Sequence, residues 1–392
     1  MFSHVYDGLD AEVRTILDRT VRPSQERTLE ILEKGAMETL GLPELAELLE
    51  IGVAPDSHEQ FQLLRVFTER RFRTPQGNHV RYIAPIYLSS HCIDACGYCN
   101  FSAARRTTAR KRLSLGDLEE ELAAVLGSGA RVIELVLGTD PELPWPVLAG
   151  HVARTSALLK REVGSGVLLC SDYLPSEAYL ALREAGLSGM IQWDETLDRQ
   201  AYPRWHATSP RKRRFEARMN NHDRAMAAGL EVATGALFGL ADFRYDALMQ
   251  IAKARFLEAE YGRRPFVFGT ARLKPIGGRE LHPATAVGDR AYETALIVYK
   301  IAEPAVDRWL QTRDTLELNL RNLLDGDAFT YRCGEVRPGG YQDSDLSSRA
   351  AAEGQFDVYG MSRETVEQEL AGSGFHIDYA WAGSGKPQWI GR

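Results

Sequence analysis

The stretch "VRYIAPIYLSSHCIDACGYCNF", residues 80–101, joins the two features from which the fold and the chemistry can be approached. Its first part, residues 80–89, is apolar almost throughout, as expected of a strand that is buried on both faces. Its second part places Cys92, Cys96 and Cys99 in a C-x3-C-x2-C pattern directly after that strand. The stretch therefore predicts a buried strand that leads into a loop with three closely spaced thiols.

Similar apolar runs recur along the chain and alternate with segments of helical periodicity. One such segment, "SLGDLEEELAAVLGSG", begins with Ser114 and Asp117 spaced as a capping box. Eight strand-like runs that alternate with helices predict an α/β fold with a (β/α)8 barrel of TIM type, full or partly open. A doubly wound sheet is the rival, but no G-x-G-x-x-G motif follows an early strand. The eight runs are residues 80–89, 131–138, 166–171, 189–195, 233–240, 266–273, 307–313 and 327–331.

The pattern divides the chain into three segments. Residues 1–75 are expected to form an N-terminal helical extension, because "ERTLEILEKGAMETL" and "LPELAELLEI" carry apolar residues at spacings of three and four. Residues 76–345 are expected to form the barrel. Residues 346–392 are expected to form a C-terminal tail that packs on the barrel.

Composition and charge narrow the class of protein. The 392 residues carry a formal net charge of −7, which gives no overall field for a nucleic-acid partner. No apolar run approaches the ~20 residues that a membrane helix needs, so no membrane partner is expected. The chain opens "MFSHVYDGLDAEVR", without a basic and then apolar run, so we expect no signal peptide and a cytoplasmic location.

The three thiols admit four interpretations. Five cysteines, an odd number, argue against a disulfide framework in a chain without a secretory signal. A structural zinc site takes four ligands; His91, Cys170 or Cys333 could add one, but no second C-x2-C or H-x3-H pair exists. Chance clustering of buried cysteines is the third interpretation. The fourth, an iron–sulfur cluster with one open iron, is favoured because thiolates are its usual ligands.

Polar or small residues stand at the carboxyl ends of several predicted strands, where a barrel carries its functional groups. Each has a structural interpretation as well: a turn glycine, a surface carboxylate at a helix start, or an arginine paired with a loop carboxylate. Their convergence on one end of the barrel favours a functional site. These residues are Gly138, Glu195, Gly239, Arg272, Arg313 and Tyr331.

A basic stretch, "RRTTARKR" from Arg105 to Arg112, follows the cysteines. The simpler interpretation is a solvated loop. The alternative is a contact with an anionic ligand or a redox partner.

The cysteine pattern, with Tyr98 before its last cysteine, resembles the signature of radical S-adenosylmethionine (SAM) enzymes. From about residue 75 to about residue 380 the chain resembles their aromatic amino-acid lyases, most of all the 2-iminoacetate synthases (tyrosine lyases) of thiazole biosynthesis. The tyrosine lyase of hydrogenase maturation is less similar, because it has a C-terminal cluster domain and no cysteine follows Cys333 here. The segments that carry the resemblance are "PIYLSSHC", "CGYCNFS", "WDETLDRQAY", "FEARMNNHDRAMAAGL", "GALFGL", "ARLKP", "QTRD" and "RPGGY".

The resemblance implies two cofactors, a 4Fe-4S cluster on Cys92, Cys96 and Cys99 and SAM on the open iron. Reductive cleavage of SAM would yield a 5′-deoxyadenosyl radical, and hydrogen abstraction from the amino group of an aromatic amino acid would break its Cα–Cβ bond. From tyrosine this would yield dehydroglycine and p-cresol. The residues implied to bind the cofactors are Tyr98, Gly138, Asp140, Glu195, Arg218, Gly239 and Arg272.

The resemblance also implies substrate contacts and partners. Arg313 matches the arginine of the family's S-T-R-E segment and would hold the substrate carboxylate in a bidentate contact. Tyr331 would stand beside the substrate in a catalytic role. The implied partners are a small amino-acid substrate, an electron donor of flavodoxin or ferredoxin type, and an enzyme that accepts the product.

Three positions depart from the family pattern. Thr139 stands where the family has a glutamate for the methionine ammonium group, with Asp140 or Glu142 as substitutes. Tyr331 stands where relatives have a small serine and would reshape the substrate pocket. Leu197 replaces an aromatic residue. Two other functions therefore stay open: a radical rearrangement or carbon shift on an amino acid such as tryptophan, and a metal-binding protein without catalysis.

Overall fold

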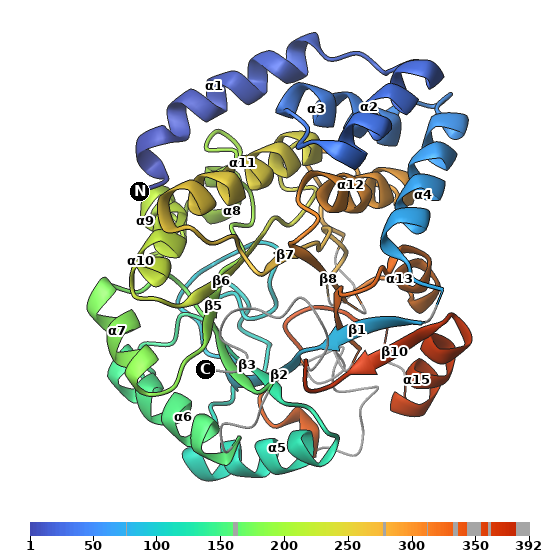
Figure 1. Ribbon diagram of the computed structural model, residues 1–392. Helices are drawn as coiled ribbons and strands as arrows, with labels where there is room; N and C mark the ends of the chain where they lie inside the picture. The colour runs from blue at the N-terminus through green and yellow to red at the C-terminus, as the bar shows by residue number, and fades with distance from the viewer. Residues whose placement is uncertain are drawn as a thin grey trace.

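The computed structural model describes residues 1–75, 77–159, 164–276, 280–311, 313–331, 336–342, 354–359 and 362–381. Its strands form a single curled sheet in which every paired neighbour is parallel, with the order β10-β1-β9-β8-β7-β6-β5-β4-β3-β2 (Figure 1). Strands and helices alternate along this sheet. The prediction of an α/β fold of TIM type is therefore confirmed.

All eight predicted runs contain a strand, but the first run contains two. Residues 80–89 hold the end of β1 and all of β2, which are separated at Ile83. β1 pairs with β9, and β2 pairs with β3. This one stretch of chain therefore connects two parts of the sheet that lie far apart in the strand order. The strands are β1 (Asn78–Tyr82), β2 (Ala84–Ser89), β3 (Val132–Leu137), β4 (Gly166–Cys170), β5 (Gly189–Ile191), β6 (Glu231–Gly235), β7 (Val267–Gly269), β8 (Asp307–Gln311), β9 (Ala328–Thr330) and β10 (Phe375–Asp378).

The last strand, β10, comes from the segment that was expected to form a packing tail. It pairs with β1 from Asn78 to Arg81 and so extends the sheet. The helix before it is α15 (Arg363–Gly372), whose first turn is capped by the Ser362 side chain.

Helices surround the sheet on its outer side (Figure 1). The Ser114–Asp117 capping box at the start of α5 forms as predicted, with both reciprocal hydrogen bonds present. The helices that follow the strands are α5 (Leu115–Gly127), α6 (Trp145–Leu158), α7 (Ser176–Glu184), α8 (Tyr202–His206), α9 (Phe215–Met219), α10 (Asn221–Ala227), α11 (Phe243–Tyr261), α12 (Asp289–Ala302) and α13 (Leu316–Asn322), with a short 3-10 helix η2 (Gly340–Gln342) near the end.

The first part of the chain forms a helical layer over two barrel helices. It consists of α1 (Ser3–Arg19), α2 (Gln25–Met37), α3 (Leu42–Val53) and α4 (His58–Phe72). In Figure 1 these helices cover α11 and α12, and α3 packs closely on α12 while α1 packs on α11. The apolar faces predicted from their periodicity are buried in the main core, for example at Leu45, Leu48 and Leu49.

A separate apolar core fills the inside of the sheet near the amino ends of the strands. Ile83, Val132, Leu168 and Ile191 belong to it, and Trp381 joins it from the other end of the chain. The Trp381 indole N–H donates to the backbone oxygen of Tyr82 at 2.9 Å. This plug of apolar side chains fills part of the inside of the sheet.

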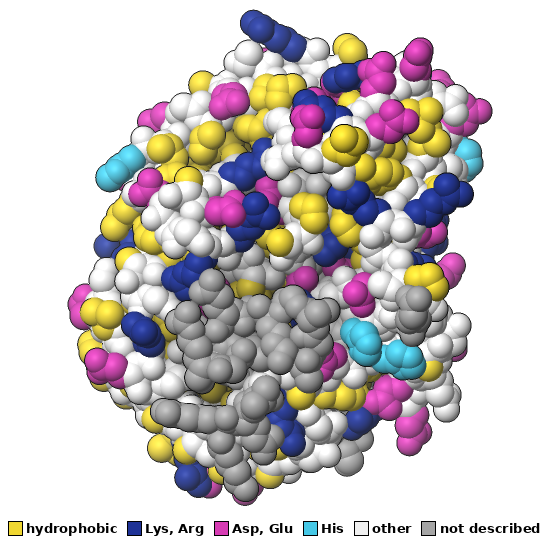
Figure 2. All heavy atoms as spheres, viewed as in Figure 1, with side chains coloured by type: hydrophobic (Ala, Val, Ile, Leu, Met, Phe, Trp, Pro, Cys, Tyr) yellow, Lys and Arg dark blue, Asp and Glu magenta, His cyan; other side chains and the backbone are white. Residues whose placement is uncertain are grey.

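Two surface findings bear on partners. Among the described helices, none has the length and apolarity that a membrane crossing requires. Figure 2 shows acidic and basic side chains interspersed over the visible face, with no broad region of a single sign.

Candidate functional site

Two adjoining cavities open at the carboxyl ends of the strands. The inner cavity lies inside the sheet and has an empty volume of about 920 Å³. The thiol cavity lies beside the cysteine loop and has an empty volume of about 610 Å³. The cavities share a wall of seven residues, namely Cys99, Val136, Cys170, Trp193, Glu195, Lys212 and Gln355.

The three cysteines of the predicted motif all line the thiol cavity. They lie in the loop that leaves β2, as expected for a functional group of a barrel. Cys96 is buried, and Cys92 and Cys99 are half-buried. Cys333 lies outside the described residues, so its place relative to them stays open.

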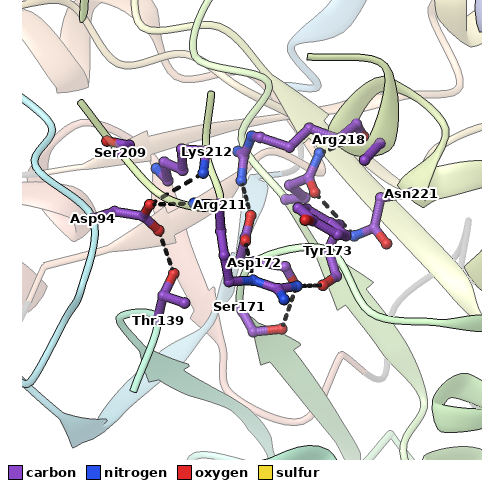
Figure 3. A network of polar contacts seen from close by, with 12 residues as sticks. Asp94, Thr139, Ser171, Asp172, Tyr173, Ser209, Arg211, Lys212, Arg218 and Asn221 are labelled. Atoms are coloured by element: carbon purple, nitrogen blue, oxygen red, sulfur yellow. Dashed lines mark hydrogen bonds and ion pairs between the residues drawn. The ribbon is translucent and has the colours of Figure 1, made fainter. Parts of the chain in front are cut away.

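Asp94 organises this loop. One carboxylate oxygen accepts hydrogen bonds from the backbone N–H groups of Arg211 and Lys212 at 2.9 and 3.1 Å. The other accepts from the Thr139 hydroxyl at 2.6 Å (Figure 3). Ser209 adds a contact by accepting from the backbone N–H of Ala95 at 3.0 Å. The cysteine loop is therefore fixed to the end of β3 and to the segment before α9.

The end of β3 also touches Cys92 directly. The backbone N–H of Thr139 donates to Cys92 Sγ at 3.3 Å. A Cβ atom on Gly138 would lie 2.8 Å from Cys92 Cβ, which real contacts do not allow. The absence of a side chain at Gly138 thus permits the close approach of strand and loop.

The chemistry of the three thiols suits a metal cluster. Burial raises the pKa of Cys92 and Cys96, and it raises the pKa of Cys99 to about 12. Such thiols stay protonated until a metal replaces the proton, so metal binding would release protons. Within the described ranges, no three His, Cys, Asp or Glu side chains converge closely enough to hold a single ion. Three thiols that line one cavity are the kind of donor set that an iron–sulfur cluster takes.

Arg218 presents a buried cationic group to the thiol cavity. Asp172 accepts from one guanidinium nitrogen, and the backbone oxygen of Trp193 accepts from another at 2.7 Å. Only 2% of the Arg218 side chain is exposed, and its Nε has no hydrogen-bond partner among the described residues. A buried donor without a partner is costly, so a bound acceptor group at this point would complete the site.

Glu195 faces both cavities and is held in a strained conformation. Its φ angle is 68°, in the left-handed region that side chains rarely adopt. Its carboxylate pairs with Lys212 Nζ at 2.6 Å. The same ammonium group lies 3.4 Å from the Tyr98 hydroxyl. This chain of contacts connects the cysteine loop with the end of β5.

Tyr98 is fixed on its other side by His206. The His206 Nδ1 lies 3.0 Å from the backbone oxygen of Tyr202, so Nδ1 carries the proton. His206 Nε2 then accepts from the Tyr98 hydroxyl at 2.7 Å. Burial lowers the pKa of His206 well below its ordinary value, which keeps the ring neutral in this role.

Arg313 lies on the inner cavity, where the sequence placed it at the end of β8. Its guanidinium carbon lies 4.4 Å from the ring centroid of Phe356, so the ring supports the flat face of the group. The neighbouring carboxylate of Asp314 forms ion pairs with Arg272 and Lys274.

Four predicted site residues lie outside the lining of both cavities, namely Asp140, Gly239, Arg272 and Tyr331. Asp140 accepts two hydrogen bonds from Arg112, at 2.7 and 2.8 Å, and one from Ser89 at 2.6 Å. Arg272 pairs with Asp314 and donates to the backbone oxygen of Val287. Gly239 occupies a turn with a φ of 110°. A cofactor role for Asp140, Arg272 and Gly239 stays a prediction.

Tyr331 requires a correction. Its side chain is fully buried in the main core, where its ring lies 4.9 Å from that of Tyr82 and its hydroxyl lies 3.0 Å from that of Tyr379. Thr330 is the residue of this strand end that lines the inner cavity. Successive residues of a strand point to opposite faces, so the expectation was displaced by one residue. Tyr331 does not belong to the lining of either cavity, and a catalytic role for it stays a prediction.

The basic stretch largely braces the cysteine loop. Arg110 donates to the backbone oxygens of Ser90 and Ser102 at 2.6 and 2.8 Å. Arg112 holds Asp140 and Glu142. These two arginines serve the fold of the loop, and a contact with a redox partner stays a prediction.

Three further residues of the site were missed by sequence reasoning. Asp94 lies inside the cysteine motif, Asp172 lies two residues after the end of β4, and Lys212 belongs to the basic run "RKRR". The position of Asp172 just after a strand was a usable signal. Asp94 and Lys212 offered none, because each resembles an ordinary loop charge.

Curated proteins of known name are similar to most of the chain. A 2-iminoacetate synthase of Escherichia coli is 28% identical over 301 residues, which cover 74% of this chain and 76% of that protein. One of Salmonella typhimurium is 26% identical over 350 residues and covers 87% of each chain. A 3-methylornithine synthase of Methanosarcina acetivorans is 25% identical over 189 residues, which cover 47% of this chain. No protein-family model matches the chain.

Solved structures share the fold. The FeFe-hydrogenase maturase HydG of Carboxydothermus hydrogenoformans superposes with a TM-score of 0.84 at 23% identity, covering 100% of this chain and 87% of its own. Methylornithine synthase superposes with a TM-score of 0.67 at 19% identity, covering 89% and 97%. At these identities the likeness establishes the architecture, and it agrees with the curled parallel sheet described above.

Proposed function

We propose that this chain, which is related in sequence to 2-iminoacetate synthase, is a radical SAM lyase that breaks the Cα–Cβ bond of an aromatic amino acid. The observation that carries the proposal is the pair of adjoining cavities. Three thiols line one cavity, Arg313 lines the other, and Cys99 and Glu195 stand in the wall between them. Cofactor and substrate can therefore meet in a buried space.

The cofactor side consists of the thiol cavity. Cys92, Cys96 and Cys99 would hold a 4Fe-4S cluster, and Arg218 and Glu195 would contact SAM. The buried Nε of Arg218 suits an acceptor such as the SAM carboxylate. When bound, these groups supply a 5′-deoxyadenosyl radical that abstracts hydrogen from the substrate.

The substrate side consists of the inner cavity. Arg313 would bind the substrate carboxylate through its planar fork, supported by Phe356. Trp193 and Trp309 meet edge to face, with centroids 5.4 Å apart, and supply aromatic walls. The apolar plug would limit the access of water to a reactive substrate from the far end of the cavity. The placement of Tyr331 in the core removes the main reason to exclude tyrosine.

Three further elements of the proposal rest on the reaction class. The reaction needs a reducing electron donor, for which we propose a protein of flavodoxin or ferredoxin type. An unstable imine product favours a partner enzyme that consumes it. We propose the cytoplasm as the location, since reducing conditions preserve an open cluster.

A radical rearrangement is the second candidate function. It is favoured by the similarity of about half the chain to 3-methylornithine synthase. The two candidates differ in the product, because a lyase releases the side chain as a separate fragment whereas a rearrangement retains it.

Anaerobic reconstitution followed by product analysis tests the proposal. We expect about four iron and four sulfide per chain, reductive cleavage of SAM, and a released aromatic fragment detected by mass spectrometry when each of the twenty amino acids is supplied. A retained side chain would favour the rearrangement. One tight zinc without SAM cleavage would favour a metal-binding protein.

A further inference from the structure

A carboxyl group lies deep in the inner cavity and has no role in the mechanism described so far. Glu134 is in the middle of β3 and lines this cavity, although only 5% of the residue is exposed. The thiol of Cys170 on the neighbouring strand forms a hydrogen bond with it. No ion pair between Glu134 and a basic side chain occurs within the described ranges. Carboxyl groups are almost never fully buried unless they are paired, so one without an ion pair in a cavity is a candidate for a role in ligand binding.

The floor around Glu134 is shaped for a flat group. Pro85 is the register partner of Glu134 on β2 and lines the same cavity. Elsewhere in the lining of this cavity, a Cβ atom on Gly269 would lie 2.2 Å from the Trp193 ring. Glycine at position 269 therefore leaves the room that the indole ring needs. Beneath this level lies the apolar plug that includes Val132 and Trp309. The carboxyl group is thus a polar point on an apolar, aromatic floor.

Glu134 and Arg313 mark different depths of one cavity. Glu134 lies before the carboxyl end of its strand, whereas Arg313 lies two residues beyond the end of β8. Because strands advance about 3.3 Å per residue, this difference separates the two groups along the axis of the sheet. Because both groups line the same cavity, a molecule that gives its carboxylate to Arg313 can reach toward Glu134 with its side chain.

We propose that Glu134 recognises the substrate by a hydrogen bond to a polar group on its aromatic ring, either a phenol hydroxyl or an indole N–H. This inference rests on the proposed function and adds the specificity of the same site. Arg313 selects the amino-acid end, the tryptophans accept the ring, and Glu134 distinguishes rings with a hydrogen-bonding group from phenylalanine. Burial raises the pKa of Glu134 to about 8, so at neutral pH the group is a carboxylic acid that both donates and accepts.

A ligand whose aromatic ring lacks a polar group would leave the Glu134 carboxyl group without a matching partner. With phenylalanine in place, the acid on the floor would lose access to water and gain no partner other than Cys170. Leaving a buried polar group unpaired costs more than a hydrogen bond adds, so such a site rejects the analogue that lacks the group. An apolar replacement of Glu134 removes this penalty and should erase the discrimination.

The test is equilibrium binding of tyrosine, tryptophan and phenylalanine by calorimetry, with the reconstituted protein and SAM under anaerobic conditions. We expect tyrosine or tryptophan to bind at least about tenfold more tightly than phenylalanine in the unaltered protein. Glu134→Leu should bring that ratio to within about twofold, mainly by improving phenylalanine binding. Glu134→Gln should keep part of the discrimination, because an amide still donates and accepts.

The matched control is Glu231→Gln. Glu231 begins β6 and pairs with Arg263 at 3.0 Å outside both cavities, so its replacement should leave the binding ratio unchanged. An unchanged ratio in Glu134→Leu, with a cooperative melting transition, would overturn the inference, as would equal binding of all three amino acids by the unaltered protein. Failure of the proposed function would instead appear as discriminating binding without SAM cleavage.

Discussion

The Thr139 hydroxyl donates a hydrogen bond of 2.6 Å to Asp94, and this contact ties the end of β3 to the cysteine loop. Thr139 stands where the resemblance placed a glutamate for the SAM ammonium group. In this chain the position serves the loop instead, through Asp94 and through the backbone contact with Cys92. The structure thus gives this departure a physical role, and Glu195 and Arg218 remain among the charged groups that line the thiol cavity.

The first prediction concerns this connection. Asp94→Ala removes the acceptor of three hydrogen bonds, including those from Arg211 and Lys212, and should leave the cysteine loop unfixed. We expect iron content after reconstitution to fall by half or more. Thr139→Val removes only one of the bonds and should have a smaller effect. Iron and sulfide analysis measures both, and full iron content in Asp94→Ala would contradict the assigned role.

The second prediction concerns the ligand set. Replacement of Cys92, Cys96 or Cys99 by alanine should each abolish the absorbance near 400 nm and all SAM cleavage, since each thiolate ligates iron. Cys170→Ala is the matched control, because Cys170 also lines the thiol cavity but lies on a strand outside the motif. Loss of the chromophore in Cys170→Ala would show that the ligand set includes this residue.

The sequence predicts the barrel well because buried strands leave continuous apolar runs. It does not show the break at Ile83, since apolar residues stand on both sides of it, and it does not reveal β10, because "FHID" is too short to form a pattern. Within the site, the spacing of the three cysteines is a local signal, and it was sufficient to predict that these thiols lie together. Asp94 and Lys212 meet across 118 residues, a contact that no local pattern encodes. Tyr331 shows how a displacement of one residue turns a side chain to the opposite face.

The third prediction concerns the cation in the thiol cavity. Asp172→Asn should loosen Arg218, because Asp172 is its anionic partner, while the cysteines stay untouched. We expect the dissociation constant for SAM to rise by about tenfold in Arg218→Ala and by less in Asp172→Asn. Iron content should stay at its original value in both. Calorimetry with SAM measures the effect, and unaltered SAM binding in both variants would remove Arg218 from the SAM site.

The fourth prediction concerns Arg313. Arg313→Lys keeps the charge but loses the planar fork that binds a carboxylate with two parallel hydrogen bonds. We expect the variant to bind the cluster and to cleave SAM slowly, with product formation from the amino acid reduced by orders of magnitude, because the reaction depends on close positioning.

Measuring 5′-deoxyadenosine and product together separates this role from a structural one. A structural ion pair would lower the melting temperature and keep the ratio of product to 5′-deoxyadenosine. A ratio that stays at its original value in Arg313→Lys would show that this arginine does not hold the substrate.

The last prediction concerns the pH dependence of stability. Burial raises the pKa of Glu134 from its ordinary 4.5 to about 8 in the folded chain, and its hydrogen-bond partner Cys170 stays a neutral thiol over this range. Between these two values the folded state holds a proton that the unfolded state has released. As far as Glu134 contributes, the free energy of unfolding should therefore be highest below pH 4.5. It should fall as the pH rises toward 8. At about 1.4 kcal/mol per tenfold change in proton affinity, the full loss is on the order of 5 kcal/mol. Glu134→Gln cannot release a proton, so its unfolding free energy should lack this fall.

Urea denaturation of both proteins at several pH values, without cluster or substrate, measures the difference between their unfolding free energies directly. Other titrating groups contribute equally to both proteins and cancel in this difference. The variant should gain stability relative to the original chain as the pH rises from about 5 to about 8. Parallel curves across that window would show that Glu134 is already ionised in the folded protein, with its charge satisfied by water in the inner cavity.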